Sequence, residues 1–265
     1  MDLVTGGTGI VGVHVLLELA RAGRSVRALH RKGSDRSIVE RVFRHYDAAH
    51  LLDRIEWAEG DLLDVSALAD AMQGVEHVHH AAAIVSFDPR LAKAMYAANV
   101  QGTANVVNAA IDAGVRKLCH VSSTAAIGRA PAEVERTEDL PWVDDGNTSD
   151  YARSKYLAEL EVQRGIAEGL DAMIVNPCVV MGPGAGTRSS MALVDRVRRG
   201  TRWYTTGSNA FVDARDVAAC MRLLVERGTV GERYLLVGEN ADYRMLFDRL
   251  SDGFGNPRPA SERCV

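Results

Sequence analysis

The chain has 265 residues, of which 31 are basic and 35 acidic, so its formal net charge is −4. This balance offers no excess of Lys and Arg to neutralise a nucleic-acid backbone, so we expect no nucleic-acid partner. No apolar run approaches the roughly 20 residues that cross a bilayer, and the first residues enter a strand pattern at once. We therefore expect a cytoplasmic protein with no signal peptide and no membrane association.

The four cysteines do not form a pattern that binds metal or builds a disulfide framework. Cys119, Cys178, Cys220 and Cys264 are widely separated, with no CxxC pair. This usage is typical of reduced thiols, several of them buried, and we expect no metal site. The chain length suits one large α/β domain with a continuous core.

Short β-branched or apolar runs alternate with helical patterns along the first two-thirds of the chain. Several helical patterns end in a glycine that can take the left-handed conformation, and Asp64, Asp88 and Ser149 stand where a side-chain oxygen can cap a first turn. Strand and helix in alternation give right-handed crossovers, so we expect an α/β fold with a doubly wound parallel sheet. The expected strands are 3–5, 25–29, 55–59, 75–80, 117–122 and 172–175, and the expected helices are 11–22, 65–73, 89–113 and 149–168.

This rhythm changes beyond Pro177. A glycine-rich loop is followed by a helical pattern at 190–199, a strand-like FVD, another helix and the strand RYLLV. We therefore expect residues 1–177 to form the core and residues 178–265 to form mainly a small lobe, with some segments returning to the core.

The loop TGGTGIVG, residues 5–12, lies between the first expected strand and the first expected helix. Gly6, Gly9 and Gly12 are spaced three apart, which permits a tight turn, a close approach of the backbone to a diphosphate, and close packing of helix against sheet. The free amides at the helix start would then face the phosphates. Because the loop follows the first strand of a βαβ unit, we interpret it as a dinucleotide-binding loop rather than a plain turn.

The end of the second expected strand, LHRKGS, indicates which dinucleotide binds. A cofactor with a free ribose 2′-hydroxyl usually meets Asp or Glu there, whereas His30, Arg31 and Lys32 offer cations suited to a 2′-phosphate. We therefore favour NADP over NAD. The alternative is that Arg31 and Lys32 are solvated loop charges.

Two further strand ends offer contacts to a flat ligand. The sequence GDLLD places Asp61 and Leu62 after the third strand, and HAAA places small residues at 81–83 after the fourth, where they leave room in the crevice. The histidines of HVHH alternate between the two faces of the fourth strand, so we interpret them as structural rather than as metal ligands.

The helix that opens with DYARSKYLAE, residues 150–159, carries the candidate catalytic groups. Tyr151 and Lys155 are four apart and share one face, whereas Tyr156 turns away. A phenol with a pKa of about 10 is a poor base at neutral pH, and a nearby ammonium favours the phenolate. An isolated Tyr/Lys pair on a helix is usually a coincidence, so its meaning depends on the glycine loop and on the serines of VSS after the fifth strand.

The motifs TGGTGIVG, GDLLD, HAAA, NVQGT, VSS, YARSK and NPCVVMGPG occur in the order seen in extended short-chain dehydrogenases/reductases. The chain resembles the NAD-dependent epimerase/dehydratase superfamily over nearly its whole length, and VRALHR and RKLCHVSS resemble the dihydroflavonol reductase and 3β-hydroxysteroid dehydrogenase branch. The resemblance implies a dinucleotide-binding core of Rossmann type at 1–177 and a mainly substrate-binding lobe beyond it. It also implies a homodimer built on the helices at 89–113 and 149–168.

The resemblance implies a role for each matching residue. Ser123 would polarise a substrate carbonyl, Tyr151 would give or take its proton, and Lys155 would lower the pKa of the tyrosine and bind the nicotinamide ribose. Hydride would pass between the nicotinamide and the carbonyl carbon. Asn99 would brace the sheet near the site. The expected cofactor contacts are Gly6, Thr8, Gly9, Ile10, Gly12, Arg31, Asp61, Leu62, Ala81, Ala82, Ala83, Ser122, Pro177 and Val179.

The first functional hypothesis is an oxidoreductase, with NADP favoured, that acts on a carbonyl or secondary alcohol of a small, partly apolar substrate. A non-catalytic dinucleotide sensor is disfavoured because both Tyr151 and Lys155 are present. The chain ends earlier than most extended members, so we expect a reduced substrate lobe. The expected pocket wall comprises Ser86, Thr124, Trp142 and Tyr204, within a surface that includes segments 86–89 and 127–129.

The second hypothesis is a nucleotide-sugar epimerase or dehydratase with tightly bound NAD. Four arginines stand where such a relative would hold a sugar-nucleotide diphosphate, namely Arg188, Arg196, Arg198 and Arg199. Three of them share one helix, which we interpret first as a solvated helix face.

Overall fold

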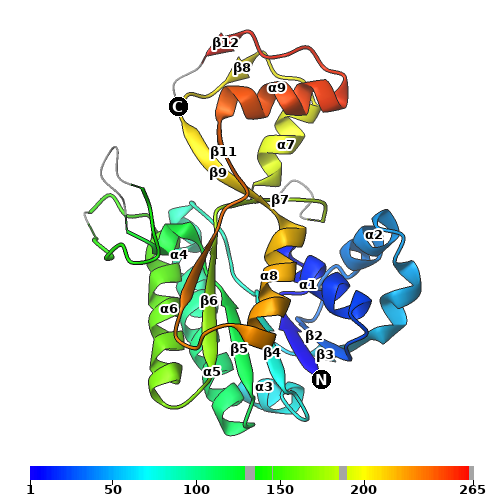
Figure 1. Ribbon diagram of the computed structural model, residues 1–265, viewed down its shortest axis with the longest axis vertical. Helices are drawn as coiled ribbons and strands as arrows, with labels where there is room; N and C mark the ends of the chain where they lie inside the picture. Colours follow the sequence, from blue (N-terminus) through cyan, green and yellow to red (C-terminus); the bar gives the residue numbers. More distant parts are fainter. Residues whose placement is uncertain (129–134, 145, 185–189, 263–265) are drawn as a thin grey trace.

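The computed structural model describes residues 1–128, 135–144, 146–184 and 190–262 (Figure 1). Its centre is a seven-stranded parallel sheet in the order β10-β6-β5-β4-β1-β2-β3. Because the chain winds outward from β1 to β3 and then returns to β4 on the other side, the strand order reverses between β1 and β4. This confirms the doubly wound α/β fold. The strands are β1 (Asp2–Thr5), β2 (Val26–His30), β3 (Ile55–Glu59), β4 (His77–His80), β5 (Lys117–Val121), β6 (Ala172–Pro177) and β10 (Arg233–Leu236).

Helices cover both faces of this sheet (Figure 1). Neighbouring strand residues point to opposite faces, so Val4 joins one buried apolar cluster and Leu3 the other. The first cluster holds side chains of α1 (Ile10–Arg21), α2 (Ser37–His45) and α8 (Ala214–Arg227). The second holds side chains of α3 (Val65–Ala71), α5 (Gly102–Asp112) and α6 (Asp150–Ala167). The two cores explain why these strands are apolar on both sides.

The caps expected from the sequence are present. The side chains of Asp64, Asp88 and Ser149 each accept a hydrogen bond from a backbone N–H of the first turn that follows. The glycines that end the first, third and fifth helices take positive φ, namely Gly23 (74°), Gly74 (70°) and Gly114 (65°).

The segment expected as one helix at 89–113 is four consecutive pieces, which corrects that prediction. They are the 3-10 turn η2 (Pro89–Leu91), α4 (Ala92–Tyr96), the π-helical turn η3 (Ala97–Gln101) and α5. Thr103 Oγ1 donates to the carbonyl of Asn99 at 2.6 Å, and such a bond competes with the regular helical ladder and bends it. The wide turn places the Asn99 side chain inside the protein, where only 1% of it is exposed.

The chain beyond Pro177 divides between a second body and the core. In Figure 1 the second body lies above the end of the sheet, while α8 packs beside α1 and β10 adds the seventh strand next to β6. The second body comprises β7 (Val179–Met181), α7 (Met191–Arg198), β8 (Trp203–Tyr204), β9 (Ser208–Asp213), β11 (Glu239–Asp242), α9 (Tyr243–Phe254) and β12 (Ser261–Glu262).

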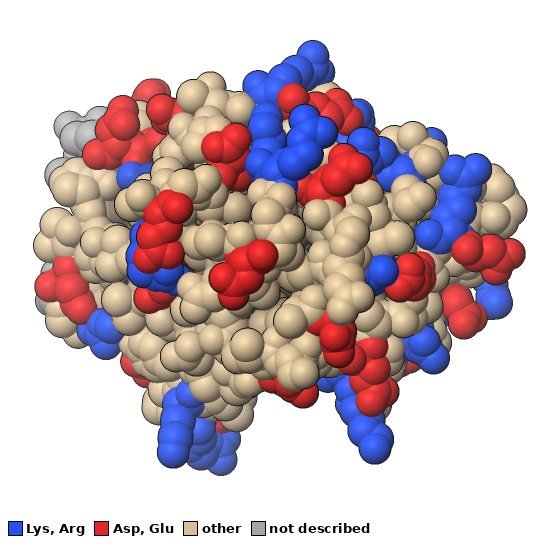
Figure 2. All heavy atoms as spheres, turned by 90° about the horizontal axis from the view of Figure 1, so that it is seen from below, with Lys and Arg blue, Asp and Glu red and all other residues tan. Residues whose placement is uncertain are grey.

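The surface seen from below carries acidic and basic side chains mixed around a largely uncharged centre (Figure 2). Within the part of the chain that the structure describes, no helix is both long and apolar enough to cross a membrane.

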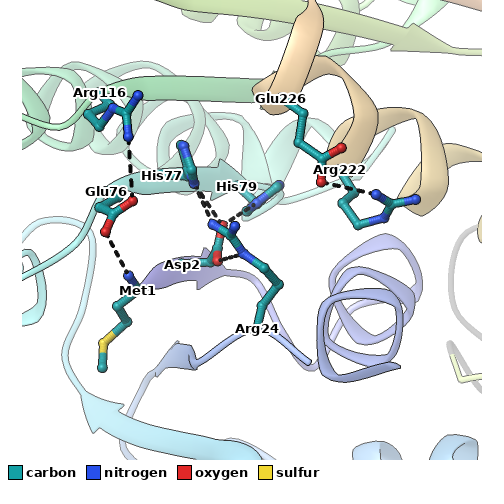
Figure 3. Close-up of polar contacts among 9 residues, drawn as sticks. All are labelled: Met1, Asp2, Arg24, Glu76, His77, His79, Arg116, Arg222 and Glu226. Carbon is teal, nitrogen blue, oxygen red and sulfur yellow. Dashed lines mark hydrogen bonds and ion pairs between the residues drawn. The ribbon is translucent and has the colours of Figure 1, made fainter. Parts of the chain in front are cut away.

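A buried polar cluster closes the lower end of the sheet (Figure 3). Asp2 is 1% exposed, and its carboxylate accepts from Arg24 Nε at 2.7 Å and lies 3.3 Å from His79 Nε2. Arg24 Nη2 also lies 2.7 Å from His77 Nδ1. The same ring nitrogen lies 3.2 Å from Asp2 Oδ1, so the guanidinium and the carboxylate both approach Nδ1 of His77.

This cluster should make folding stability depend on acidity. Burial would raise the pKa of Asp2, but His79 and Arg24 hold it at about 2, below the ordinary 3.8. A carboxyl whose pKa is depressed by folding stabilises the folded state above its ordinary pKa, and this contribution is lost as the pH falls toward 2. The difference corresponds to about 2 kcal/mol.

Asp2→Asn should therefore lose about 2 kcal/mol of unfolding free energy at pH 6 and only about a third of that at pH 2.5. Urea unfolding at a series of pH values measures this. Asp252→Asn is the control, since Asp252 is half exposed and paired with Arg258, and it should change little. An Asp2→Asn penalty that is equal at both pH values would contradict this account of the cluster.

Candidate active site

The glycine loop brings three backbone segments into direct contact at the end of the sheet. Gly6 has φ 71°, and a Cβ added there would lie 2.6 Å from the backbone nitrogen of Ala82, which follows β4. A Cβ added to Gly12, in the first turn of α1, would lie 2.1 Å from the carbonyl oxygen of Gly6. Side chains at either position would push β1, α1 and the β4 loop apart.

The first turn of α1 presents unpaired amides beside this loop. Gly9 is the N-cap residue, and no side chain caps the helix. The first amides of a helix have no partner within it, and the helix dipole favours negative charge at this end. The loop is closed on itself by the Gly9 N–H, which donates to Gly6 at 2.8 Å. A dinucleotide diphosphate fits this cradle of backbone and free amides.

A cavity of about 660 Å³ continues from the loop past the ends of β2 and β3. The expected contacts Thr8, Arg31 and Asp61 all line it. Leu62 instead packs against Gly102 of α5 and gives its carbonyl to Asn105 at 2.9 Å. Lys32, which the sequence offered with Arg31 for a 2′-phosphate, also lines the cavity. The sequence did not identify four further lining residues, Ser34, Ile38, Glu59 and Gly60.

Ser123 and Tyr151 meet above the end of β5. Ser122 is buried and directly follows the last residue of β5. The next residue is Ser123, and the Ser123 hydroxyl caps the short turn η4 (Thr124–Ala126). Tyr151 lies in the first turn of α6, held by the Ser149 cap. Burial raises the pKa of Tyr151, and a side-chain hydrogen bond with Ser123 acts in the opposite direction.

Lys155 lies one turn further along α6 and is 1% exposed. Its Nζ donates to the carbonyl of Val121 at 2.8 Å and lies 3.5 Å from His120 Nε2. Burial lowers its pKa to about 8, while the charge of Glu159 raises it. The structure thus brings Ser123, Tyr151 and Lys155 together. The pKa of Tyr151 is nevertheless raised rather than lowered, since burial outweighs the other influences on it.

A line of hydrogen bonds runs from β1 into the interior beside this site. Thr103 donates to Asn99, so it must accept from His80 Nε2 at 3.0 Å. His80 Nδ1 is then an acceptor and receives the Thr5 hydroxyl proton at 2.7 Å, while Thr5 accepts from the Ala82 amide at 3.2 Å. Burial followed by the nearby Lys155 lowers the pKa of His80 to about 3, so the ring is neutral.

Asn99 continues this line to α6, the helix that carries Tyr151 and Lys155. Its amide group accepts from Ile84 N at 2.7 Å, donates to Ile84 O at 2.9 Å, and donates to Ser154 Oγ at 3.0 Å. Ser154 in turn donates to the carbonyl of Tyr151 at 2.8 Å. Asn99 therefore braces both the loop after β4 and the first turn of α6. We did not identify Ser154 from the sequence, although it stands beside Lys155 on a face that the helical period turns inward.

The residues expected to wall the substrate pocket take different positions. Ser86 accepts from the amide of Asp88 at 3.1 Å within the loop after β4. In the same loop Phe87 contacts Tyr151 edge to face at 5.8 Å between ring centroids, and 77% of its surface is exposed. Trp142 stacks on Tyr156 at 4.4 Å. Thr124 opens η4 beside Ser123, and Tyr204 lies in the second body under Arg244.

Two arginines at the end of α7 form ion pairs with the same carboxylate. Arg198 and Arg199 both pair with Asp195, at 2.6 and 2.7 Å. This arrangement is the solvated helix face that we considered first. Arg188 lies outside the described residues, as does Arg129 of the expected pocket segment 127–129. Of the remaining expected contacts, Ile10 opens α1, Ala81 and Ala83 follow β4, and Pro177 and Val179 lie at the end of β6 and the start of β7.

Comparison with known proteins agrees with this arrangement. A family model described as the NAD dependent epimerase/dehydratase family matches residues 3–237. The chain belongs to this family. The matched range includes the glycine loop and four residues of the candidate site, Asn99, Ser123, Tyr151 and Lys155.

Two relatives and one solved structure are similar over almost the whole chain. Sterol demethylase protein B of Methylococcus capsulatus is 34% identical over 261 residues, covering 97% of this chain and 75% of that protein. A Synechocystis protein named as a dihydroflavonol 4-reductase is 33% identical over 262 residues, covering 97% of this chain and 73% of that one. The dTDP-glucose 4,6-dehydratase DesIV of Streptomyces venezuelae, solved with NAD bound, superposes with a TM-score of 0.82 at 26% identity, covering 100% of this chain and 84% of that one.

This family member is an NAD(P)-dependent oxidoreductase of the extended short-chain dehydrogenase/reductase type. The dihydroflavonol reductase resemblance that VRALHR and RKLCHVSS carry in the sequence is confirmed.

Proposed function

We propose that the protein transfers hydride between NADP and a carbonyl or secondary alcohol of a small, partly apolar substrate, using Ser123, Tyr151 and Lys155. The observation that carries the proposal is the buried Lys155 one turn from a tyrosine that is hydrogen-bonded to Ser123. All three lie at the same end of the sheet as the glycine loop, where a dinucleotide can reach them.

The three side chains divide the proton chemistry among them. The Ser123 hydroxyl would donate to the substrate carbonyl oxygen and hold it within reach of Tyr151. In reduction, the Tyr151 phenol would give its proton to that oxygen as negative charge develops there, which suits the raised pKa of this group at neutral pH. The Lys155 ammonium would stabilise the phenolate that remains. The nicotinamide, when bound, supplies the hydride.

Exposed apolar side chains in the segment that contacts Tyr151 through Phe87 support a partly apolar substrate. Phe87 is 77% exposed although it is a large apolar residue, and Val85 and Leu91 in the same segment are 45% and 46% exposed. Such rings and aliphatic groups gain about 25 cal/mol for each Å² of apolar surface that a substrate covers. The names of two relatives, a sterol demethylase protein and a dihydroflavonol reductase, support the same substrate class.

This proposal is tested by following NADPH oxidation with a panel of aryl and alkyl ketones and aldehydes. We expect turnover with the aryl and polycyclic members and weak turnover with short alkyl ones. No turnover of either cofactor across the panel would overturn the proposal. Retention of NAD through purification, with thermal stabilisation by a UDP-sugar, would instead favour the epimerase or dehydratase hypothesis. The ion pairs of Arg198 and Arg199 with Asp195 argue against that hypothesis, because they engage two of the arginines that it needs for a diphosphate.

The cofactor preference rests on the cavity beyond the glycine loop. Arg31 and Lys32 line it and are exposed, so both are available to a 2′-phosphate. Asp61 and Glu59 also line it, and these carboxylates could accept from a 2′-hydroxyl. We favour NADP because Arg31 and Lys32 directly follow β2, where the ribose of a dinucleotide lies in this fold.

Arg31→Asp should raise the Kd for NADPH by about 10- to 100-fold, the loss expected for a charge-assisted contact, and should leave the Kd for NADH unchanged or lower. Fluorescence titration with each cofactor measures both constants. Arg227→Asp at the end of α8 is the matched charge control and should change neither. Equal affinities for NADPH and NADH in the unmodified protein would refute the role of Arg31.

We also propose a homodimer, built on the helical segments at 89–113 and 149–168, and a cytoplasmic location. The exposed Leu91 and Leu160, 46% and 45% accessible, support a partner on this side. The described cysteines Cys119, Cys178 and Cys220 are free, as is usual in a reducing compartment. Light scattering should give twice the mass of one chain, and a monomer would contradict the first proposal.

A further inference from the structure

We propose that Glu159 is a positioning residue of this active site, which keeps Lys155 in its charged form and holds the backbone of Ser123. The inference rests on the proposed roles of Ser123, Tyr151 and Lys155. Glu159 lies four residues after Lys155 on α6, on the same helix face and one turn deeper in the protein, where 3% of it is exposed.

Glu159 is tied to the catalytic serine through one amide. Its Oε1 accepts from Asn176 Nδ2 at 2.6 Å, and the same nitrogen donates to the carbonyl of Ser123 at 3.0 Å. Both acceptors face Nδ2, so the reverse orientation of the amide would set oxygen against oxygen. Glu159 therefore fixes the amide that fixes Ser123. Asn176 Oδ1 is buried without a partner, a cost that the two bonds of Nδ2 offset.

Arg233 anchors the other side of the carboxylate. It lies at the start of β10, with Nη1 3.4 Å from Glu159 Oε2, and its Nη2 donates to the carbonyl of Glu138. The side chain of Glu138 accepts from Leu235 N at 2.8 Å, also in β10. Glu159 thus joins α6 and β6 to the strand that returns from beyond residue 177.

Among the titratable groups around Lys155, Glu159 is the one whose negative charge favours the ammonium form. The neighbours of Lys155 are His120 from β5 and His80 from β4, and Arg233 from β10 faces Glu159. Burial lowers the pKa of both histidines, followed by the effect of Lys155, so neither carries charge at neutral pH. Burial lowers the pKa of Lys155 as well, and Glu159 is the influence that raises it.

Glu159 itself is subject to opposing influences. Burial raises its pKa, while hydrogen bonding from Ser122 and Asn176 and the charges of Arg233 and Lys155 lower it. The carboxylate and the ammonium therefore stabilise each other's charged forms. Without the carboxylate, a buried Lys155 would become neutral at a lower pH and would no longer support a Tyr151 phenolate.

The charge of Lys155 can be measured without turnover, because the chain has four lysines, Lys32, Lys93, Lys117 and Lys155. Selective ¹³C labelling of lysine gives four ε-carbon signals whose shifts follow protonation, and Lys155→Met assigns the signal of interest. In the unmodified protein this signal should titrate near pH 8. In Glu159→Gln, which keeps the acceptor for Asn176 but removes the charge, it should titrate about one pH unit lower or more.

The control is Glu161→Gln, which removes the same charge two residues along α6. Glu161 is partly exposed and pairs with Arg164 at 2.9 Å, so this change should leave the Lys155 titration where it is. An unshifted Lys155 signal in folded Glu159→Gln would overturn the inference, whether or not a substrate is known.

Activity adds a second readout. For carbonyl reduction the phenol and the ammonium must both be protonated, and the pKa of Tyr151 lies above its ordinary range, so the alkaline fall in kcat belongs to Lys155. Glu159→Gln should move this fall about one pH unit lower. Glu159→Asp should leave it in place but lower kcat several-fold, because the shorter side chain draws Asn176 from Ser123. A loss of kcat in both variants with no movement of the alkaline fall would show a purely structural role and refute the inference.

Discussion

Replacing Tyr151 with phenylalanine should lower kcat for carbonyl reduction by about 10²- to 10⁴-fold, the usual contribution of a positioned general acid. The phenol belongs to a partly exposed side chain, is hydrogen-bonded to Ser123 and lies one helical turn from buried Lys155. Phenylalanine keeps the ring and its edge contact with Phe87, so it removes the proton and little of the packing. The Kd for NADPH should therefore stay within about threefold of the original value.

The chain supplies its own control for this substitution. Tyr156 lies on the same helix five residues later, and its ring stacks on Trp142 at 4.4 Å rather than meeting Ser123. Tyr156→Phe keeps that stack and should leave kcat within about twofold. Single-turnover measurements with saturating NADPH separate the chemical step from product release. Equal losses in the two variants would mean that Tyr151 does not supply the proton.

Much of the core could be predicted because its signals are local. The central strands β1, β4, β5 and β6 are buried on both faces, so apolar runs such as LVT and AMIV stand out from the amphipathic helices between them. The Asp64 and Ser149 caps mark helix starts by their own chemistry. The short helix α2 was missed although Ile38, Val42 and Phe43 follow a helical spacing. Its surroundings of Arg and Ser made the segment read as a loop.

Tertiary contacts decided the features that could not be predicted. The strand RYLLV was expected, but its place as β10 at the edge of the central sheet follows only from its pairing with β6. The π-helical turn accompanies a hydrogen bond from Thr103 to the carbonyl of Asn99 within the helical segment. The turn places the Asn99 side chain where it binds Ile84, which lies in a different segment of the chain. Trp142 carries no sign in the sequence that it will stack on Tyr156.

Some residues of the candidate site could be predicted from the sequence, and others could not. The spacing of Tyr151 and Lys155 is a property of one helix, so the sequence was enough to pair them. Glu159 continues the same spacing by one more turn, but its meaning depends on Asn176 and Arg233, which come from two later strands. Phe87 lies in a segment that the sequence assigned to the pocket wall, whereas its contact with Tyr151 depends on how Asn99 holds the loop at Ile84.

The same hydrogen bonds connect the cofactor loop to the catalytic helix. Thr5 ends β1 just before the glycine loop, and through His80 and Thr103 it reaches Asn99. Asn99 in turn reaches Ser154 and the backbone of Tyr151. A displacement of the glycine loop should therefore disturb both cofactor binding and the position of Tyr151, the proposed proton donor.

Gly12→Ala is the smallest substitution that should produce such a displacement. The added Cβ would lie 2.1 Å from the carbonyl oxygen of Gly6 and 2.9 Å from the Cα of Gly7. Both atoms are backbone, so α1 must move away from the loop and take its free amides out of register with the diphosphate. Overpacking of this kind typically costs about 1–3 kcal/mol, and we expect the Kd for NADPH to rise by up to about 100-fold, with kcat lowered as well.

Gly253→Ala is the matched control. Gly253 lies within α9, and no heavy atom lies within 4 Å of a Cβ added there. Alanine at this position should leave cofactor binding unchanged and stabilise the helix by up to about 1 kcal/mol. Calorimetric titration with NADPH and thermal unfolding distinguish the two substitutions. The methyl group of Gly12→Ala must break the backbone contact between α1 and the glycine loop. If this variant bound NADPH as tightly as the original protein, that contact would not be what shapes the cofactor site.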